Sequence, residues 1–460
     1  MTFPLFCDTT LLSMDDGAVR KAWVMEQGKL KPDGYQARIA DAQVGRLLDT
    51  FGAVEIAGPM WCGKTWTSLS FAASVSRIGR AAERSLAKAD PSTALLGDQP
   101  HAIDEWQDVP EIWDEVRYRV DETRNHPGQF ILTGSSEPQK ERLHHSGAGR
   151  IATYRMSTMT LAEMGASSGT VSLAGLFDGN FTPVLAQQGL ETYAGHICRG
   201  GWPALLETQA DAWNASGGNS YVENYLDALF EVSLPRRGLD AGVGRRVAQS
   251  LARNVGQSAK YLTIAQDAGI MAASDKEAAE IASRYVSELV RLYVVEEVPG
   301  WDAPIRSKSR LRVRPKRYFA DPSIPATLLG ASKDRIMKDG QLFGLLFESL
   351  AMHDLRVYAS AVPGATRDSL RYYRDADGLE VDAIIELDDG RWAGIEIKLG
   401  ENKVPEGIAS LRRLQDKIAR NPAARNPTPS FLAVLVGAGV AARQDRDSGV
   451  YVIPLTCLGA

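Results

Sequence analysis

A phosphate-binding loop is predicted in the first quarter of the chain. Residues 58–65 read Gly-Pro-Met-Trp-Cys-Gly-Lys-Thr, which is a glycine, four residues and then Gly-Lys-Thr. In such a loop the backbone N–H groups converge on phosphate oxygens, the lysine reaches the outer phosphates and the threonine hydroxyl ligates Mg²⁺. We therefore expect ATP and Mg²⁺ at this loop. The residues expected to contact them are Gly58, Pro59, Met60, Trp61, Cys62, Gly63, Lys64, Thr65 and Trp66.

Two adjacent carboxylates are expected to complete the site. Asp104 and Glu105 follow a short apolar run and lie forty positions after Lys64. At the end of a parallel strand, Asp104 would orient Mg²⁺ and its water shell, and Glu105 would polarise the attacking water. The alternative is an ordinary helix start, because a helix is predicted just after Val109.

A third strand, predicted at residues 129–136, ends in hydroxyl groups. Thr133 and Ser135 are candidates to contact the γ-phosphate or the attacking water, because ligands collect at the carboxyl edge of such sheets. They could equally be simple turn formers. Arg150 follows a glycine-containing loop and would serve either as an arginine finger acting in trans or in a surface ion pair.

A second group of charged residues lies near the C-terminal end. Asp382 and Glu396 are fourteen positions apart on two predicted consecutive strands, and Lys398 follows Glu396 by two. Residues two apart on a strand project to the same face. Two carboxylates can hold Mg²⁺ while a lysine stabilises charge on a phosphate or nucleophile. The alternative is a set of hairpin charges with Glu396 and Lys398 as a surface pair.

A basic segment precedes this group. Seven of the twelve residues in 306–317 are basic and none is acidic. Alternate residues of an extended strand share a face, so the segment would present a basic stripe suited to the backbone of DNA or RNA, in a salt-sensitive manner. A solvated strand face, or pairing with acidic groups of this protein, is the alternative. The stripe comprises Arg306, Lys308, Arg310, Arg312, Arg314 and Lys316.

Regular elements must position these residues. The apolar run 51–57 predicts a buried strand entering the phosphate loop, and helical spacing follows from Trp66. Phosphate chemistry does not account for Trp61, which is expected under the nucleotide base or against a neighbouring domain. Residues 244–300 show the order short helix, turn, longer helix, strand, which is typical of a winged helix. Acidic residues near the start of its last helix leave a protein contact as the alternative to DNA.

Composition limits the class of protein. A chain of 460 residues with ordinary hydrophobic (44%) and charged (24%) fractions predicts about three globular domains. A net charge of −5 excludes a global basic field. Its four cysteines lie far apart, which argues against a disulfide framework or a cysteine metal site. We find no secretory signal and no membrane-spanning run, and therefore expect a cytoplasmic protein without membrane contact.

The motifs together resemble a large prokaryotic family of AAA-type P-loop ATPases whose C-terminal domain of unknown function is similar to PD-(D/E)XK nucleases. The stretches that carry the resemblance are residues 51–54, 61–66, 103–107, 130–136 and 201–204. The resemblance implies an α/β protein with a parallel-sheet ATPase core, a helical lid and a C-terminal nuclease-like domain. It also implies that Glu348 adds a further acidic metal ligand to Asp382 and Glu396. The domains expected are an extension (1–34), ATPase core (35–184), lid (185–243), winged-helix-like module (244–305) and nuclease-like domain (306–460).

The leading expectation is a Mg²⁺-dependent ATPase coupled to a nuclease-like domain that engages DNA or RNA. The second is a nucleotide-dependent switch that recognises a protein partner and does not cut nucleic acid. A homo-oligomer is compatible with either, because ring assembly is frequent in AAA proteins.

Overall fold

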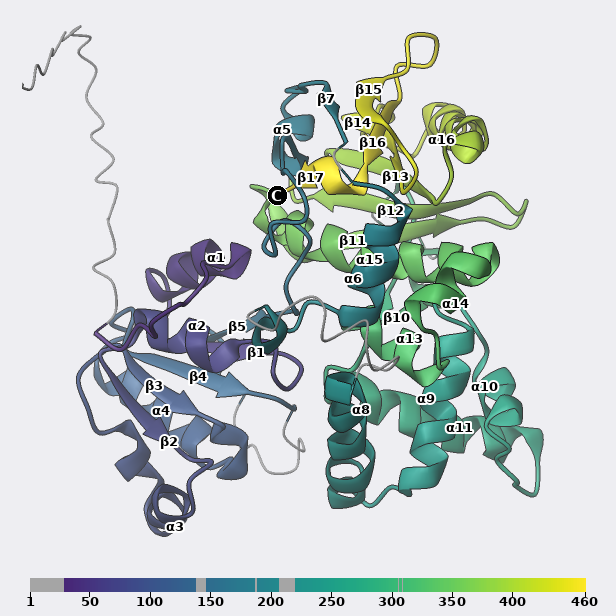
Figure 1. The fold of residues 1–460 in the computed structure, drawn as a ribbon. Coiled ribbons are helices and arrows are strands. Elements are labelled where there is room, and N and C mark those ends of the chain that lie inside the picture. The colour runs from purple at the N-terminus through teal and green to yellow at the C-terminus, as the bar shows by residue number, and fades with distance from the viewer. Residues whose placement is uncertain (1–28, 138–145, 187, 207–219, 305, 308) are drawn as a thin grey trace, which may run out of the picture.

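The computed structural model describes residues 29–137, 146–186, 188–206, 220–304, 306–307 and 309–460. The predicted extension at 1–34 lies largely outside these residues. Figure 1 shows three regions, with an N-terminal α/β core, a group of helices beside it and a large sheet above both. In the described residues, no helix is both long and apolar enough to cross a membrane.

The N-terminal core is built on a five-stranded parallel sheet of order β2-β3-β4-β1-β5. Helices α1 and α2 cover one face, where α1 packs with the outward side chains of β1, while α4 covers the other. The elements are α1 (Ile39–Leu48), β1 (Ala53–Ala57), α2 (Lys64–Phe71), β2 (Ser74–Arg77), α3 (Ala81–Ala89), β3 (His101–Asp104), α4 (Ile112–Glu122), β4 (Phe130–Gly134) and β5 (Ile151–Arg155).

The strand register brings the predicted site residues to one edge. Strand β4 lies between β1 and β3, with Ala57 opposite Gly134 and Asp104 opposite Thr133. Because all three strands are parallel, their carboxyl ends meet, and the loop that follows β1 lies beside the acidic end of β3. The strand expected before the loop is thus confirmed.

The middle of the chain is mainly helical. Helices α9, α10 and α11 pack together, and strand β8 that follows them pairs antiparallel with β10. These elements follow the order on which the winged-helix prediction rested; the winged-helix-like module and DNA reading by α11 both stay predictions. The elements are α6 (Leu190–Arg199), α8 (Ser220–Asp227), a π-helical turn (Ala228–Ser233), α9 (Ala241–Arg253), α10 (Tyr261–Asp267), α11 (Asp275–Arg291), β8 (Val295–Val298), α12 (Ser309–Arg312), β10 (Lys316–Phe319), α13 (Ser323–Leu328) and α14 (Lys333–Lys338).

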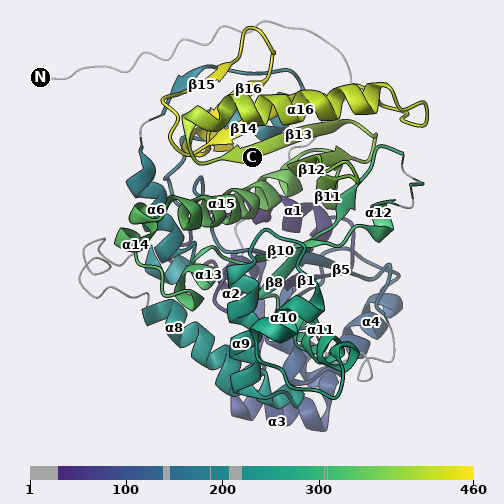
Figure 2. The same cartoon turned by 90° about the vertical axis from the view of Figure 1, so that its right-hand side faces the viewer.

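The C-terminal domain contains a mixed eight-stranded sheet of order β7-β15-β16-β14-β13-β12-β11-β9. Helices α15 and α16 pack on opposite faces, since the alternating side chains of β13 and β14 divide between their two clusters (Figure 2). The elements are β9 (Gly300–Trp301), α15 (Gly340–Ala361), β11 (Ala365–Arg374), β12 (Glu380–Leu387), β13 (Trp392–Lys398), α16 (Val404–Ala419), β14 (Phe431–Val436), β15 (Ala441–Gln444), β16 (Tyr451–Pro454) and β17 (Leu458–Gly459).

Two short segments differ from the expected boundaries. Strands β6 (Val171–Ser172) and β7 (Val184–Leu185), with α5 (Leu173–Phe177) between them, were expected in the ATPase core at 35–184. Instead β6 pairs with β17 and β7 pairs with β15. Strand β9, expected in the winged-helix-like module, joins the C-terminal sheet through β11. The chain therefore enters the C-terminal domain once before it forms the helical region and again afterwards.

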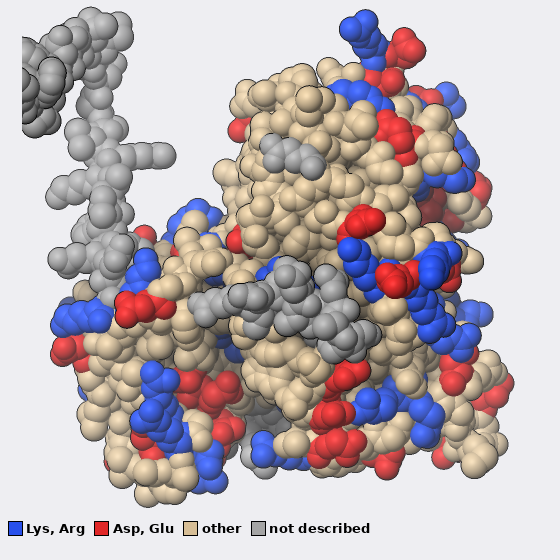
Figure 3. All heavy atoms as spheres, viewed as in Figure 1, with Lys and Arg blue, Asp and Glu red and all other residues tan. Residues whose placement is uncertain are grey.

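Surface charge is mixed on the face shown in Figure 3. Blue and red side chains are mixed over the lower core and the helices, and a broad uncharged area covers the left and middle of the upper domain, whose right edge carries both signs. This agrees with the small net charge of the chain. A nucleic-acid contact must therefore depend on a local group of cations.

Candidate functional site: an ATP-binding edge joined to the C-terminal domain

The phosphate loop depends on two glycines. A Cβ atom on Gly58 would lie 2.3 Å from the backbone oxygen of Met156, so only glycine permits this close approach of two segments. Gly63 has φ +105°, a conformation that L side chains rarely adopt, and it directly precedes helix α2. These positions turn the loop so that Lys64 and Thr65 begin the helix. The Lys64 ammonium is buried in the loop and donates to the backbone oxygens of Gly58 (3.0 Å) and Pro59 (2.7 Å).

One carboxylate oxygen of Asp104 is hydrogen-bonded to two of the predicted site residues. Asp104 Oδ1 accepts hydrogen bonds from Thr65 Oγ1 at 2.8 Å and from Thr133 Oγ1 at 2.7 Å. The start of α2 and the ends of β3 and β4 are thereby joined at the carboxyl edge of the sheet. Carboxylate and hydroxyl oxygens are ligands that Mg²⁺ prefers. Thr65 and Asp104 therefore fit an ion held next to phosphates on the loop.

Glu105 is held beside this group. Its backbone N–H donates to Thr133 Oγ1 (3.3 Å), and its carboxylate accepts from Ser135 Oγ (3.1 Å) and from the Gln107 side chain. Glu105 has φ +60°, which is uncommon for a residue other than glycine and is found preferentially at functional sites. Gln107 was not among the predicted site residues, although it lies only two positions after Glu105.

The remaining loop residues differ in their surroundings, and their contacts with a nucleotide stay predictions. The Trp61 ring packs against Tyr221 (5.0 Å between centroids) and Tyr225 (5.6 Å), so of the two expected positions it takes the one against a neighbouring domain. Cys62 is fully buried, and Met60 packs against the large core shared by the helical region and the C-terminal domain. Trp66 on α2 remains 46% exposed.

Arg150 lies at the opposite edge of the sheet. It directly precedes β5, whose first residue pairs with the first residue of β1. Its Nε donates to Asp121 at 2.7 Å, in a half-exposed ion pair. Arg150 therefore does not reach the phosphate loop of its own chain, and a role in trans stays a prediction.

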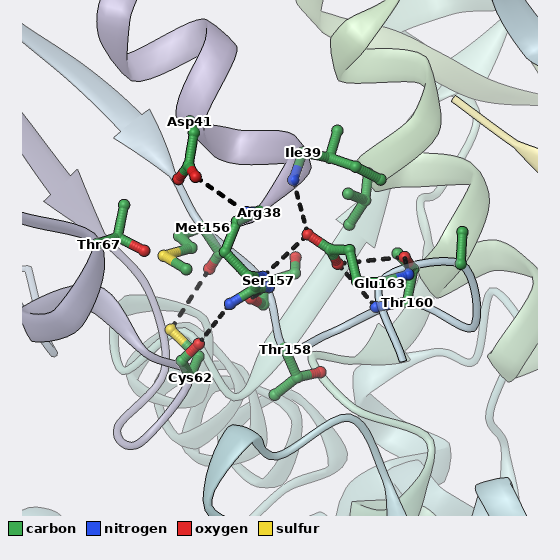
Figure 4. A network of polar contacts seen from close by, with 12 residues as sticks. Arg38, Ile39, Asp41, Cys62, Thr67, Met156, Ser157, Thr158, Thr160 and Glu163 are labelled. Atoms are coloured by element: carbon green, nitrogen blue, oxygen red, sulfur yellow. Dashed lines mark hydrogen bonds and ion pairs between the residues drawn. The ribbon is translucent and has the colours of Figure 1, made fainter. Parts of the chain in front are cut away.

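A buried ion pair supports the phosphate loop from behind (Figure 4). The side chains of Arg38 and Glu163 are only 4% and 3% exposed and meet at 2.9 Å. The guanidinium also donates to the backbone oxygens of Cys62 (3.0 Å) and Ser157 (3.0 Å). Glu163 in turn accepts from Ile39 N (2.8 Å). Burial disfavours the ionised carboxylate, but the charge of Arg38 more than offsets it, and the pKa of Glu163 is lowered.

Residues 156–163, which follow β5 and which we call the linker, are bonded to both the helical region and the C-terminal domain. Thr158 Oγ1 donates to Asp321 Oδ2 at 2.6 Å and lies 2.9 Å from His353 Nε2. Three residues further on, Leu161 N donates to Asp354 Oδ2 (3.1 Å) on α15. These groups are buried, so their polar atoms depend on one another rather than on water.

A second contact begins at the predicted strand end after Ser135. Glu137 N donates to the backbone oxygen of Arg291 at 2.9 Å, and Glu137 O accepts from Arg237 Nη2 at 2.9 Å. Arg237 also pairs with Glu288 of α11 at 2.7 Å. The helical region therefore contacts the ATP edge at both the Trp61 loop and the segment following Ser135.

In the C-terminal domain, the structure brings Asp382, Glu396 and Lys398 together on β12 and β13. Lys398 Nζ lies 2.5 Å from Glu396 Oε2 and 3.7 Å from Asp382 Oδ2. Glu348 of α15 joins them through Lys316, whose Nζ lies 3.4 Å from both Glu348 Oε1 and Asp382 Oδ1. The ammonium of Lys316 also contacts Glu380 at 2.7 Å, and its side chain is only 4% exposed.

The protonation of this group follows from that arrangement. Burial and the nearby charge of Asp382 raise the pKa of Glu348 to about 7, and they raise the pKa of Glu396 well above its ordinary value. Burial opposes ionisation of Asp382 as well, but Lys316 and Lys398 hold its pKa below the usual range. The charge of the carboxylates is thus balanced by two ammonium groups.

Mg²⁺ does not fit this arrangement. Lys316 places its ammonium between the carboxylates that a metal ion would have to bridge. Within the residues that the structure describes, no three His, Cys, Asp or Glu side chains form a group that could hold a metal ion. The metal role predicted for Glu348, Asp382 and Glu396 therefore finds no preformed site, and we derive no metal-dependent step there.

The basic segment is not one extended stripe. Residues Ser309–Arg312 form the short helix α12, and only Lys316–Phe319 form a strand. Arg310 pairs with both carboxylate oxygens of Glu386 at 2.6 and 2.7 Å, and Lys316 is buried as described, so neither is free for a nucleic-acid backbone. Arg306, Arg312 and Arg314 are exposed. Lys308 lies outside the described residues.

Comparison with known proteins agrees with the geometry of the N-terminal core. Residues 50–165 match the family described as AAA domain, so the chain contains a P-loop ATPase domain of AAA type. Residues 190–335 and 343–458 each match a domain of unknown function (DUF8612 and DUF4143). A similarity of the last domain to PD-(D/E)XK nucleases stays a prediction.

Among relatives, the uncharacterized proteins Rv2008c of Mycobacterium tuberculosis and Mb2031c of Mycobacterium bovis are each 26% identical over 372 residues. The alignment covers 79% of this chain and 74% of theirs. Among solved structures, the Walker-type ATPase PABY2304 of Pyrococcus abyssi aligns with 66% of this chain and 98% of its own, with a TM-score of 0.42 and 12% identity.

Removing the charge of Glu163 should destabilise the protein strongly. Glu163→Gln leaves the Arg38 guanidinium buried without its counter-charge, which we expect to cost about 3–5 kcal/mol. Asp227→Asn, in a pair with the half-exposed Arg245, is the matched control and should cost less than about 1 kcal/mol. Urea unfolding followed by tryptophan fluorescence measures both, and equal shifts of the two midpoints would contradict the assigned role of the buried pair.

The His353 contact should make stability depend on pH. Burial lowers the pKa of His353, but Asp354 and Asp321 more than compensate and raise it. The protonated form therefore favours the folded state, and its contribution is complete below pH about 6.5 and lost as pH rises through the folded-state pKa. We expect the wild type to exceed His353→Gln in urea midpoint by more at pH 6 than at pH 9.

His196 provides the control for this measurement. Burial, with Arg199 nearby, lowers the pKa of His196 to about 4, so it stays neutral in the folded protein over that pH range. The unfolded chain takes up a proton near pH 6.5, and the wild type should therefore lose stability relative to His196→Gln at pH 6. If lowering the pH from 9 to 6 changed the urea midpoint of the wild type, relative to the variant, in the same direction for both histidines, the assigned pKa shifts would be refuted.

Proposed function

We propose that this chain is a Mg²⁺-dependent ATPase whose AAA-type core is mechanically coupled to a C-terminal domain that engages DNA or RNA. The observation that carries the ATPase part is the convergence of Thr65 and Thr133 on one oxygen of Asp104. That arrangement joins the phosphate loop, the acidic strand and the strand between them into one site. ATP hydrolysis is the reaction that these residues support.

Each residue at the edge has a role in this mechanism. The loop N–H groups and the Lys64 ammonium would bind the phosphates, with Lys64 exchanging its two backbone acceptors for phosphate oxygens. Thr65 and Asp104 would hold Mg²⁺, which neutralises charge on the phosphates when bound. Glu105 would orient the attacking water and accept its proton, while Ser135 and Gln107 fix the direction of the Glu105 carboxylate.

Nucleotide state would reach the C-terminal domain through the linker behind the loop. Arg38 bonds to the loop at Cys62 and to the linker at Ser157, and Leu161 of the linker is bonded to Asp354 of α15. A movement of the loop on binding phosphate would thus shift the linker relative to α15. The proposal includes a cytoplasmic homo-oligomer in which the half-exposed Arg150 acts on a neighbouring subunit.

A second candidate function is a nucleotide-dependent switch whose C-terminal domain recognises a partner without cutting nucleic acid. The ammonium of Lys316 among Glu348, Glu380 and Asp382 favours it, because it neutralises the carboxylates that metal-dependent cleavage would need. In this case ATP turnover would alter binding by the C-terminal domain, and no phosphodiester bond would break.

Phosphate release tests the ATPase proposal. We expect Mg²⁺-dependent turnover by the wild type and a loss of about 100-fold or more in kcat for Glu105→Gln, with binding of a fluorescent ATP analogue retained. Lys64→Ala should lose both turnover and binding. Glu111→Gln, an exposed carboxylate just outside the site, is the matched control. Turnover that survives Lys64→Ala would overturn the site assignment.

Degradation assays separate the two candidates. The wild type and Glu396→Ala are incubated with labelled DNA and RNA in Mg²⁺, with and without ATP. Degradation by the wild type that Glu396→Ala abolishes would favour the nuclease. Intact substrate with both proteins, together with ATP turnover, is the result that the Lys316 position leads us to expect.

A further inference from the structure

A cavity of about 800 Å³ lies between the helical region and the C-terminal sheet. One wall is the segment from the end of α9 to the start of α10, and the other is formed by residues 312–314 with strands β11 and β12. In Figure 2, α12 lies beside β11, with α10 below them. The cavity is therefore bounded by two parts of the chain that are distant in sequence.

Cations line this cavity from several elements. Lys260, Arg312, Arg314 and Arg374 all contribute to the lining, against the single carboxylate of Glu380. In the described part of the chain, Lys260, Arg312 and Arg314 make no ion pair. Arg374 is half exposed and shared between Glu380 (3.7 Å) and Ser258 Oγ (3.4 Å). The cavity is thus a concave surface of excess positive charge in a chain of net charge −5.

The Arg314 segment is fixed in place. The hydroxyl of Tyr372 donates to the backbone oxygen of Arg314, and the Tyr372 side chain is itself buried. Val313 lies between the two exposed arginines and is half-buried against Gly300, where a Cβ would lie only 2.8 Å from it. Arg312 and Arg314 are therefore held at the cavity by a packed backbone.

A smaller recess adjoins the cationic cavity. It has a volume of about 350 Å³ and shares Val313 and Arg374 with the larger one. Its lining includes the carboxylates of Asp302 and Asp375 and the almost fully buried side chains of Trp301 and Tyr373. A carboxylate can accept hydrogen bonds from the exocyclic amino groups of a nucleobase, whereas the cations next to it are suited to phosphates.

We propose that these two adjoining cavities bind single-stranded nucleic acid, with its phosphates on Lys260, Arg312, Arg314 and Arg374 and a base in the recess. This inference rests on the proposed function and locates the nucleic-acid contact that it contains. A flexible strand can follow a concave surface, whereas a duplex presents its phosphates on a stiff convex one. The shape of the surface thus favours a single strand over duplex DNA.

The bound strand would lie against the buried carboxylate group. Glu380 belongs both to the cavity lining and to the ion pairs of Lys316. Gly256, at the opposite wall, would place a Cβ only 2.9 Å from Glu348 Oε1. A phosphodiester in the cavity would therefore lie beside Glu380 and near Glu348, while the buried Lys316 ammonium stays paired with these carboxylates.

Fluorescence anisotropy with labelled single-stranded and duplex oligonucleotides tests the assignment. For Arg312→Ala/Arg314→Ala we expect about tenfold weaker binding of single strands at low salt, and a slope of log K against log salt smaller by about 1.4. Arg335→Ala/Lys338→Ala removes the same charge from the exposed helix α14 and should match the wild type. Arg312→Lys/Arg314→Lys should keep the slope, which excludes a folding defect as the cause.

Four outcomes would overturn the proposal, and they are distinguishable. Equal binding by wild type and Arg312→Ala/Arg314→Ala would overturn the cavity assignment and leave the proposed function intact. No salt-dependent binding by the wild type would overturn the nucleic-acid part of both. Tighter binding of duplex, or competition by pyrophosphate at equal phosphate concentration, would replace the single strand by another ligand. ATP turnover, measured on the same preparation, reports separately on the ATPase proposal.

Discussion

The buried pair of Arg38 and Glu163 is the constraint on which the rest of the structure depends. A guanidinium that is almost fully buried needs its counter-charge and acceptors for its other N–H groups. Here the acceptors are backbone oxygens of the phosphate loop and of the linker after β5. The loop cannot change shape without disturbing the linker, and the linker is bonded to buried groups of α15. The buried ion pair thus connects the phosphate loop to the C-terminal domain through the linker.

The chain uses partly buried carboxylates in two opposite ways. Asp104 is satisfied by two hydroxyls and, in the described structure, by no cation, so its charge is available to a metal ion. Asp382 is paired with two ammonium groups and accepts from a backbone N–H, so its charge is already compensated. Asp104, at the end of β3, therefore favours metal binding, whereas Asp382, within β12, disfavours it.

The ATP edge could be predicted because its signals are local. Residues 58–65, Asp104 and Thr133 each end or follow a recognisable strand, and a parallel sheet brings such ends together. Arg38 and Glu163 carry no periodic or motif signal, since they lie far apart and outside regular strands. Lys316 was expected on an exposed basic stripe, but its carboxylate partners Glu348, Glu380 and Asp382 lie far along the chain and give no local signal. Strands β6 and β7, with two residues each, are too short for any pattern.

The seam between linker and α15 also has a consequence for synthesis on the ribosome. Glu163 is synthesised well before Asp321, His353 and Asp354, which bond to Thr158 and Leu161 of the linker. At about 5–20 residues per second, the delay between Glu163 and Asp354 is about 10–40 s. During that interval the parallel sheet can form, whereas Thr158 and Leu161 still lack their permanent partners. All residues of the proposed ATP edge are thus made before residue 164, whereas the buried groups that hold the linker in place are made later. The position of the linker is therefore fixed only after α15 has been translated.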